Sequence, residues 1–275
     1  MRRSALYVPA DRPDRVQKVW NRTGEAAPDV VIADLEDGVA PSAKAAARAH
    51  LADLLGTWPA DGRPVYVRLG GVTLLDDDLG ALAGLPVDGW YWPKAEPDSL
   101  ERLDAALTAH GRTEPVVALI ESARGVLAAE EIAAHHRVER LGLGEADLVA
   151  DLGADPGPDG TELFLARSTV VLASAAAGLD GPSGPASTDV RDLAPLEGSC
   201  EILRRLGFAG RSCIHPDQVP VVNRTFGPSE ADLDTAREVV AAFDRAIAAG
   251  EGVTVGPDGR MIDEAVVRRA RRLLG

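Results

Sequence analysis

The acidic residues that end one apolar segment are the first sign of chemistry in this sequence. The segment VVIADLEDGV, residues 30–39, carries Asp34, Glu36 and Asp37 close together. Side chains alternate along a strand, so Asp34 and Glu36 would share one face and Asp37 would point away. Like charges this close repel one another, and burying them is costly. The pattern is typical either of a surface turn or of a cation-binding or catalytic site at the end of a strand.

Two further acids follow apolar segments and could bind a metal ion. Glu121 ends the segment VVALIE, and Asp147 follows LGLGEA at a glycine turn before a predicted helix. Two carboxylates from adjacent strand ends suit Mg²⁺, which takes oxygen ligands, keeps waters and needs only one or two protein carboxylates. Two simpler interpretations stay open. Glu121 could form an exposed ion pair with Arg124, and Asp147 could be stabilised by the dipole of its helix.

Arg68 and a glycine turn could bind an anion beside these acids. Arg68 lies within the apolar segment VYVRL, where its planar fork could hold a substrate carboxylate or carbonyl. Alternatively, its side chain could snorkel or pair with the acids at 34–37. The turn at Gly144, Glu145 and Ala146 would present backbone N–H groups at a helix start, which favour an anion. We therefore predict that metal, arginine and amides converge on one small oxyanion.

The elements that must position these residues alternate between strands and helices. We predict strands at 4–9, 30–34, 65–69, 89–94, 116–121, 139–144, 186–190 and 211–216. Segments with helical periodicity lie between them, at 42–55, 98–110, 124–136 and 163–178. This alternation favours an α/β fold with a parallel sheet, and eight units at this length favour a (β/α)8 TIM barrel, whose active residues sit at the carboxyl ends of the strands. A doubly wound open sheet is the alternative.

The C-terminal part of the chain extends beyond the eighth unit. Residues 230–250 predict one long helix ended by a glycine, and a Gly/Pro turn and a short basic helix follow. We therefore expect a TIM-barrel catalytic domain at 1–226 and a helical extension at 227–275. The extension would be an extra layer, or a lid that reaches a neighbouring subunit.

Composition limits the classes of partner. The 275 residues are 45% hydrophobic, enough for a large core, and 43 acids against 29 bases give a net charge of −14. This charge argues against nucleic acid or an anionic membrane as the main partner. Cys200 and Cys213 form neither a metal pattern nor a disulfide framework. The first residues contain no signal-peptide core, and no apolar run is long enough for a bilayer, so we expect a cytoplasmic protein that binds small molecules.

Ordered segments over almost the whole chain resemble one family. They are RSALYVPADRPDR, VIADLEDGVAPSAKAAAR, VYVRL, YWPKAE, ALIESARGVLAAEEIA, LGLGEADLVADLG, ARSTVVLASAAAGL, STDVRDL, GFAGRSCIHPDQVPVVNRTFGPS and DGRMIDEAVVRRA. Together they are similar to the citrate lyase β-subunit-like branch of the HpcH/HpaI aldolases, near the malyl-CoA and citramalyl-CoA lyases.

The resemblance implies a TIM barrel that binds Mg²⁺, or Mn²⁺ as an alternative, through Glu121 and Asp147. Arg68 would hold a small oxo or hydroxy acid, with the amides of the 144–147 turn on its carboxylate. In such proteins an acidic residue of a motif like GRMIDEA reaches the site of an adjacent subunit, and here that residue is Asp263. The family implies a homotrimer or a hexamer.

The resemblance also implies supporting roles for other charged residues. Glu36 and Asp37 would orient metal-bound waters and Arg68 from behind the metal ligands. Asp37, or a metal-bound water, would take the substrate hydroxyl proton. Arg12, Arg15 and Lys18 would contact the phosphates of CoA, although a solvated helix face is an equally good interpretation of these bases.

The implied reaction is reversible cleavage of a 3-hydroxy-acyl-CoA, such as malyl-, citramalyl- or citryl-CoA, to acetyl-CoA and a small 2-oxo acid. A class II pyruvate-type aldolase acting on free oxo acids is a rival interpretation. Such enzymes carry a motif like D-x-E-H at the end of the second strand, whereas this chain has Asp37 in place of the histidine. They also tend to have glutamine two residues before the metal-binding glutamate, where this chain has Leu119. Two further interpretations stay open. The chain could be a citrate lyase β subunit acting on a citryl-carrier protein, or a non-catalytic subunit that binds CoA esters.

Overall fold

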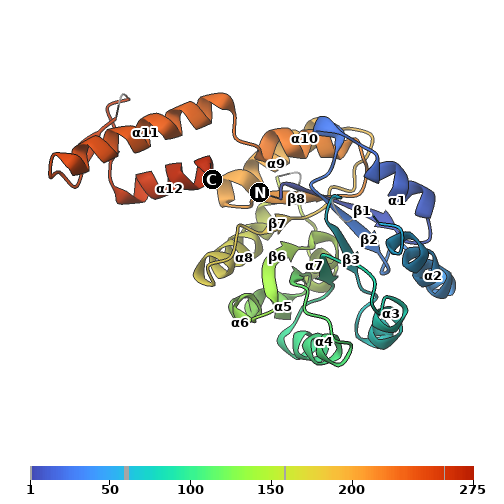
Figure 1. Ribbon diagram of the computed structural model, residues 1–275. Helices are drawn as coiled ribbons and strands as arrows, with labels where there is room; N and C mark the ends of the chain where they lie inside the picture. The colour runs from blue at the N-terminus through green and yellow to red at the C-terminus, as the bar shows by residue number, and fades with distance from the viewer. Residues whose placement is uncertain (1, 59–61, 158, 257) are drawn as a thin grey trace. The chain divides into compact units, whose positions relative to one another are not determined.

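Eight parallel strands close into a barrel (Figure 1), which confirms the predicted (β/α)8 architecture. The structure is a computed structural model that describes residues 2–58, 62–157, 159–256 and 258–275. Hydrogen-bonded neighbours follow chain order around the ring, and the last strand pairs with the first. The strands are β1 (Ser4–Pro9), β2 (Val30–Asp34), β3 (Val65–Arg68), β4 (Gly89–Trp92), β5 (Val116–Ile120), β6 (Val138–Leu143), β7 (Ser183–Gly184) and β8 (Gly210–Cys213).

Helices surround this barrel on its outer face (Figure 1). They are α1 (Pro13–Trp20), α2 (Lys44–Leu55), α3 (Leu75–Ala81), α4 (Pro97–Ala109), α5 (Ala123–Leu127), α6 (Ala129–Ala134), α7 (Glu145–Leu152), α8 (Phe164–Ala176), α9 (Ala194–Leu206) and α10 (Gln218–Phe226). Short 3-10 turns lie at Gly24–Ala26, Pro41–Ala43, Val72–Leu74 and Thr161–Leu163. Parallel strands need such crossovers, which cover the outer face of the sheet.

The alternation of side chains along each strand separates two apolar layers. In β5, Val117 and Leu119 face the barrel interior, whereas Val116, Ala118 and Ile120 belong to the larger core between barrel and helices. The same two-residue period continues past the strand ends, because every second residue returns to the same face. It therefore places Asp34 above Ile32, Arg68 above Tyr66 and Glu121 above Leu119. Asp34, Arg68 and Glu121 thus form a charged layer at the carboxyl end of the barrel interior.

The seventh strand is shorter and lies earlier than predicted. Residues 186–190 form a loop, and the strand consists of Ser183 and Gly184. The β-branched residues of ASTDV favoured a strand, but packing overrides this propensity. A Cβ at Gly184 would lie 2.9 Å from Leu203 Cδ1 and 3.3 Å from the Gly210 carbonyl oxygen, so the barrel closes here only through a small residue. Asp189 is consequently an exposed loop residue and does not end a strand.

The C-terminal unit, Gly227–Gly275, has its own small core, and the barrel unit is Met1–Phe226. It contains α11 (Glu230–Ala248), a short antiparallel pair of β9 (Thr254–Val255) and β10 (Met261–Ile262), and α12 (Glu264–Leu274). Phe243, Ile262 and Val267 pack together between these elements. Among the residues that the structure describes, no helix combines the length and apolar character needed to cross a membrane.

Two glycines allow a test of how tightly the barrel is closed. A Cβ at Gly210 of β8 would collide with the Arg3 carbonyl group and lie 2.8 Å from the Arg2 carbonyl oxygen, and backbone atoms cannot move aside cheaply. We expect Gly210→Ala to lower the free energy of unfolding by about 1–3 kcal/mol, as overpacking does. Urea denaturation followed by circular dichroism measures this.

Gly198 provides the matched control for this substitution. It lies inside α9, and a Cβ there would meet no atom within 4 Å. Because alanine favours a helix over glycine, Gly198→Ala should raise the free energy of unfolding by roughly 0.5–1 kcal/mol. Equal effects at the two positions would contradict the close contact at the β1–β8 junction.

Candidate active site

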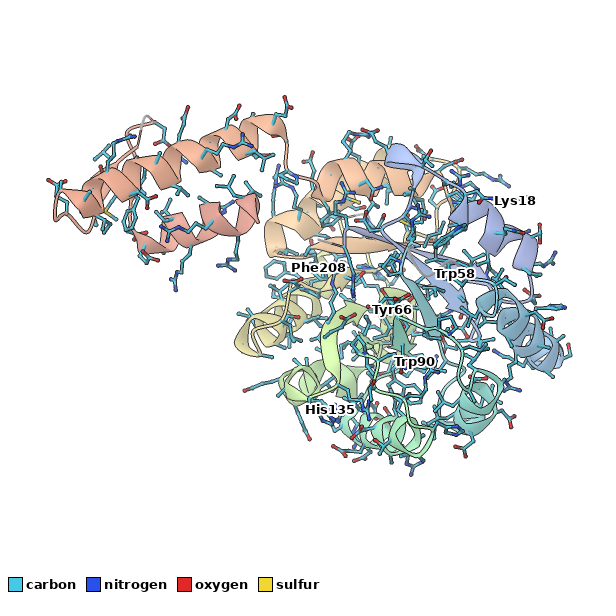
Figure 2. All side chains as sticks on the ribbon, in the orientation of Figure 1. Lys18, Trp58, Tyr66, Trp90, His135 and Phe208 are labelled. Atoms are coloured by element: carbon cyan, nitrogen blue, oxygen red, sulfur yellow. The ribbon has the colours of Figure 1, made fainter. Side chains whose placement is uncertain are left out.

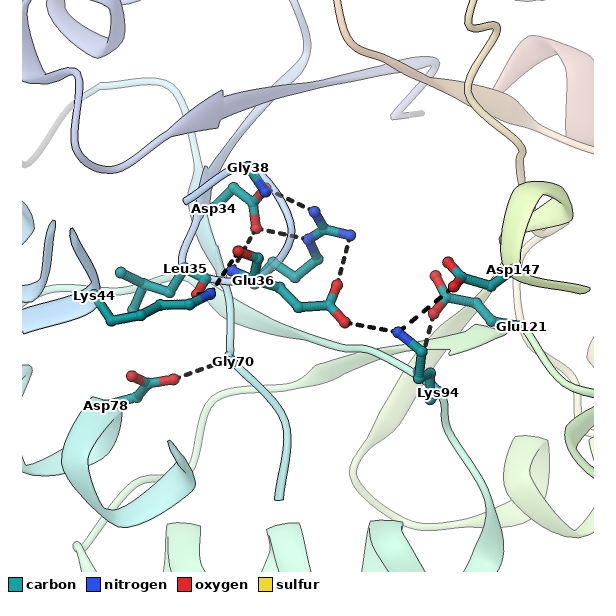
Figure 3. A network of polar contacts seen from close by, with 11 residues as sticks. Asp34, Leu35, Glu36, Gly38, Lys44, Gly70, Asp78, Lys94, Glu121 and Asp147 are labelled. Carbon is teal, nitrogen blue, oxygen red and sulfur yellow. Dashed lines mark hydrogen bonds and ion pairs between the residues drawn. The ribbon is translucent and has the colours of Figure 1, made fainter. Parts of the chain in front are cut away.

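Strand register holds Arg68 against Asp34 at the carboxyl end of the barrel. The two residues are partners in the β2–β3 ladder. Arg68 Nε and Nη2 donate to the two Asp34 carboxylate oxygens at 2.7 and 2.6 Å. The backbone N–H groups of Glu36 and Gly38 donate to the same carboxylate at 2.8 and 2.9 Å (Figure 3). These donors compensate the burial of Asp34, which therefore belongs to the framework of the site.

The Arg68 guanidinium group is held by two further contacts. It lies 4.7 Å from the centre of the Tyr7 ring, within the range of a cation–π interaction. Its Nη1 lies 2.7 Å from Glu36 Oε2, but this is an ion pair without hydrogen-bond geometry, so Oε2 keeps an unfilled acceptor position. Burial acts to lower the pKa of Arg68, but the hydrogen bonds and charge of Asp34 raise it above its ordinary value. The group stays cationic.

Lys94 connects Glu36 to the other acids. Its Nζ donates to Glu36 Oε1 at 3.0 Å and lies 3.7 Å from Asp147 Oδ1, while its backbone N–H donates to Glu121 Oε2 at 3.1 Å (Figure 3). Burial raises the pKa of Glu36, although Arg68 and Lys94 both act to lower it. The acids that follow β2, β5 and β6 therefore meet in one network.

Glu121 is a buried carboxylate with an unusual charge environment. It directly follows β5, and only 6% of the residue is exposed. An added Cβ at Gly144 would lie 2.5 Å from Glu121 Oε1, so the glycine allows the carboxylate to rest against the end of β6. Burial, followed by the negative charges of Glu36 and Asp147, raises the pKa of Glu121 to about 7. A carboxylate so strongly perturbed within a cleft is typical of a functional site.

The turn before α7 offers fewer free amides than the sequence predicts. The Gly144 N–H donates to the Ile120 carbonyl group at 2.9 Å inside the barrel ladder, so it is not available to an anion. Glu145 and Ala146 lie in the first turn of α7, where N–H groups have no acceptor within the helix. The Glu145 side chain accepts two hydrogen bonds from Arg167, at 2.6 and 3.0 Å. Glu145 could therefore bind substrate through its backbone, while its carboxylate anchors the turn.

One pocket with a volume of about 440 Å³ is bordered by Arg68, Glu121, Asp147 and the turn before α7. Its wall is partly charged, partly apolar and partly hydroxylic. It is lined by Tyr7, Pro9, Asp34, Asp37, Gly38, Arg68, Leu119, Glu121, Leu143, Gly144, Glu145, Ala146, Asp147, Ala186, Thr188, Ser212 and Ile214. The predicted metal acids, the arginine and the turn thus share a cavity large enough for a small organic acid.

The charges of this site leave room for a divalent cation. When Asp34, Glu36, Glu121 and Asp147 are all ionised, they contribute four negative charges against the two positive charges of Arg68 and Lys94. Two negative charges are then uncompensated within the contacting set. The Asp34 carboxylate is fully used by Arg68 and the backbone, which leaves oxygens of Glu121 and Asp147 as ligands. An all-oxygen set of this kind fits Mg²⁺ or Mn²⁺.

The remaining predicted residues lie outside this contact network, and they include the exposed Arg15. Asp37 is exposed and lines the rim of the pocket. Arg12 lies 3.8 Å from Asp11, and Lys18 pairs with Asp14 at 3.3 Å on the outward face of α1 (Figure 2). Neither base is among the described residues that line the pocket. Asp263 belongs to the C-terminal unit, where it caps α12 by accepting the Val266 N–H at 3.0 Å.

The sequence placed Lys94 among the polar residues at strand ends that together suggest a site, but it indicated no specific role for Lys94. The packing of Tyr7 against Arg68 was not predicted. The signals were a lysine directly after the apolar segment GWYWP and an aromatic residue two positions after Ala5, on the interior face of β1.

Lys44 is a further supporting residue. Its Nζ donates to the Leu35 and Glu36 carbonyl groups at 2.5 and 2.6 Å and fixes the loop that carries the acids (Figure 3).

Asp78, at the start of α3, supports the strand that carries Arg68. Asp78 is buried, accepts the Gly70 N–H at 2.7 Å, and pairs with Arg48 at 2.6 Å. It therefore anchors the chain just beyond β3, where Arg68 ends the strand.

Comparison with known proteins finds relatives over nearly the whole chain. Residues 3–216 match the family model of HpcH/HpaI aldolase/citrate lyase. The chain is 37% identical to a citrate lyase subunit beta-like protein of Mycobacterium tuberculosis, over 98% of this chain and 93% of the relative. It is 34% identical to a (3S)-malyl-CoA thioesterase of Cereibacter sphaeroides, over 99% and 93% of the two chains.

A solved structure shares the fold over nearly the full length. It is the protein CitE from Mycobacterium tuberculosis in complex with magnesium, acetoacetate and coenzyme A. The TM-score is 0.78 at 35% sequence identity, and the match covers 99% of this chain and 96% of that one.

The raised pKa of Glu121 predicts a pH-dependent stability in EDTA. A buried acid with a pKa of about 7, against 4.5 as its ordinary value, binds its proton more tightly when folded. Its contribution to stability is complete below about pH 4.5 and is lost as the pH rises through 7. Relative to wild type, Glu121→Gln should therefore gain up to about 3 kcal/mol of unfolding free energy between pH 4.5 and 8. Denaturant unfolding at several pH values measures the difference.

Glu130→Gln is the control, because Glu130 is exposed on α6. Its stability should follow that of the wild type across the same pH range. A Glu121→Gln profile parallel to wild type would contradict the assignment of Glu121 as a perturbed buried acid.

Proposed function

Because the chain belongs to the HpcH/HpaI aldolase/citrate lyase family, we propose that it is a Mg²⁺-dependent carbon–carbon lyase. Its substrate would be a 3-hydroxy-acyl-CoA such as malyl-, citramalyl- or citryl-CoA, cleaved to acetyl-CoA and a small 2-oxo acid. The observation that carries this proposal is the convergence of Glu121, Asp147 and Arg68 on one pocket at the carboxyl end of the barrel. The CitE relative with magnesium, acetoacetate and coenzyme A supports the choice of ligands.

Glu121 and Asp147 would hold the metal ion. When bound, Mg²⁺ supplies a Lewis acid that polarises the oxygen next to the substrate carboxylate. Arg68 would stabilise negative charge on the same oxygen, and it is preorganised for this role because Asp34, Glu36 and Tyr7 fix its position. The free amides of Glu145 and Ala146 would bind the substrate carboxylate at the start of α7.

Acid–base chemistry falls to residues away from the metal ligands. Asp37, on the exposed rim of the pocket, would accept the hydroxyl proton, and Glu36 would keep Arg68 and Lys94 oriented. Asp263 would protonate the acetyl carbon after the carbon–carbon bond breaks, from a neighbouring copy in a homotrimer or hexamer. For this, the residues 227–275 would act as a lid over that neighbour's site. Arg12 and Lys18 would contact the CoA phosphates.

The apolar part of the pocket favours a thioester substrate over a polyhydroxylated one. Leu119, Leu143 and Ile214 offer no side-chain hydrogen bonds, which a polyhydroxylated substrate would need. A volume of about 440 Å³ holds the acid and the reactive end of the thioester, so the rest of CoA would extend outside. A carrier-protein thioester would present the same reactive end.

Hydrolysis of the thioester is a second candidate, because relatives at 34% identity are (3S)-malyl-CoA thioesterases. The two reactions differ in their products. Carbon–carbon cleavage of malyl-CoA gives acetyl-CoA and glyoxylate without a free thiol, whereas hydrolysis gives malate and the CoA thiol.

Removal of a metal ligand tests the proposed function. Purified protein is assayed with malyl-, citramalyl-, citryl- and β-methylmalyl-CoA, with Mg²⁺ or with EDTA, and acetyl- or propionyl-CoA, oxo acid and free thiol are measured. We expect Mg²⁺-dependent cleavage of at least one thioester, and Glu121→Ala should lower kcat/KM by about a thousandfold or more.

Glu130→Ala, on the exposed face of α6, serves as the matched control and should keep full activity. Full activity of Glu121→Ala on the preferred thioester would refute the metal assignment. Turnover of free oxo acids without CoA would instead establish the aldolase reaction, and inactivity on every ester with intact CoA binding would favour a binding subunit.

Mixing two inactive variants tests whether Asp263 acts across subunits. Glu121→Ala and Asp263→Ala should each be nearly inactive alone. If subunits mix randomly after co-expression, about a quarter of the sites would pair an intact barrel with an intact neighbouring Asp263, and activity should return to that fraction. Because Asp263 also caps α12, Asp263→Asn controls for loss of the cap. If activity returns neither when Glu121→Ala is mixed with Asp263→Ala nor when it is mixed with Asp263→Asn, Asp263 does not act in the site of a neighbouring subunit.

A further inference from the structure

Lys94 contacts three carboxylates of the site with two different groups. Its Nζ reaches Glu36 at 3.0 Å and Asp147 at 3.7 Å, and its backbone N–H reaches Glu121 at 3.1 Å (Figure 3). The ammonium group therefore lies beside the two acids proposed to bind Mg²⁺. The Lys94 ammonium group thus supplies one positive charge beside these acids, at the place where a bound Mg²⁺ ion would supply two.

The backbone of Lys94 is strained in a way that favours this arrangement. Its φ is +47°, the only positive value for a non-glycine residue in the described part of the chain. A side chain in this region is disfavoured, and such a conformation persists where the surroundings hold it. The hydrogen bond from its backbone N–H to Glu121 helps to hold this conformation, and the side chain extends to Glu36.

Glu36 and Asp147 hold the Lys94 ammonium group with different strength. The Glu36 side chain is only 10% exposed and is fixed by Arg68, whereas the Lys94 and Asp147 side chains are 53% and 42% exposed. The Glu36 contact is a hydrogen bond, but the contact with Asp147 is a longer ion pair. Asp147 is thus the carboxylate that Lys94 releases most easily.

We propose that Lys94 is a tethered counter-cation, which neutralises the carboxylate cluster in the metal-free protein and competes with Mg²⁺ for Asp147. This inference rests on the proposed metal site at Glu121 and Asp147. When Mg²⁺ binds, the ammonium group gives up Asp147 and keeps Glu36, because like charges repel strongly at these distances in a partly buried site. Lys94 is a positioning residue, since it acts on the metal ligands and lowers their affinity for Mg²⁺.

Mg²⁺ titration by calorimetry without substrate tests this proposal. Lys94→Met removes the charge and keeps the length of the side chain, so it should bind Mg²⁺ about tenfold more tightly than the wild type. Lys94→Arg keeps the charge and should retain the wild-type affinity within about threefold. Lys94→Gly relieves the backbone strain but also removes the charge, and it should tighten binding as the methionine variant does. Arg102→Met removes one positive charge from the exposed face of α4 and should change nothing.

Thermal unfolding supplies a second measurement that needs no activity. In EDTA, Lys94→Met should melt below the wild type, because its carboxylates repel one another without a counter-cation. Saturating Mg²⁺ should restore most of the difference, so the Mg²⁺-induced increase in Tm should be larger for the variant.

The outcomes separate this inference from the function on which it rests. A wild-type protein that binds no Mg²⁺ would overturn both. Mg²⁺ binding by the wild type, with equal affinity in Lys94→Met, would overturn the counter-cation alone. Weaker binding in Lys94→Met would also overturn it and would show that Lys94 supports metal binding. Tighter binding in both Lys94→Met and Arg102→Met would assign the effect to net charge and would also overturn it.

Discussion

The hydrogen-bonded ion pair between Asp34 and Arg68 is the interaction on which the site depends. It joins two neighbouring strands at their last paired residues, so it exists only in one register of the barrel. Each partner is nearly buried, and removing either would leave the other charge without compensation. The arginine then orients Glu36, and Glu36 orients Lys94. Loss of the Asp34–Arg68 pair would therefore change the positions of Glu36 and Lys94, and through Lys94 the environment of the acids proposed to bind the metal.

The barrel interior explains why such a costly set of charges can be held in place. Apolar and aromatic residues fill most of the lower layers, and Asp34, Arg68 and Glu121 lie at the carboxyl ends of β2, β3 and β5. Glycines at 142 and 144 of the β6 end leave room for Leu119 and Glu121, because a side chain there would collide with them. Burial without full compensation raises the pKa of Glu121 towards neutrality. The fold thus holds mutually repelling carboxylates close together, and a bound cation would reduce this repulsion.

Much of the site could be predicted because both the strand period and the parallel topology are visible in the sequence. Every second residue of VVIAD, VYVR and VVALIE faces the interior, so Asp34, Arg68 and Glu121 follow from counting. The seventh strand could not be predicted in this way, because Ser183 and Gly184 carry no strand propensity and are selected by close packing. The use of the Gly144 N–H within the ladder and the role of Lys94 also depend on register and backbone conformation, which periodicity does not determine.

The two-residue seventh strand makes the barrel an uneven ring. β1 and β2 share five paired positions, whereas β6 and β7 share one. Fewer ladder bonds mean a lower cost of local opening, so the ring has a seam between β6 and β8. Ala186 and Thr188, which form one wall of the pocket, lie in the loop just beyond that seam. That wall is therefore held by fewer ladder bonds than the side formed by β1 and β2, so its shape is the part of the pocket least tied to the strand register that positions Asp34 and Arg68.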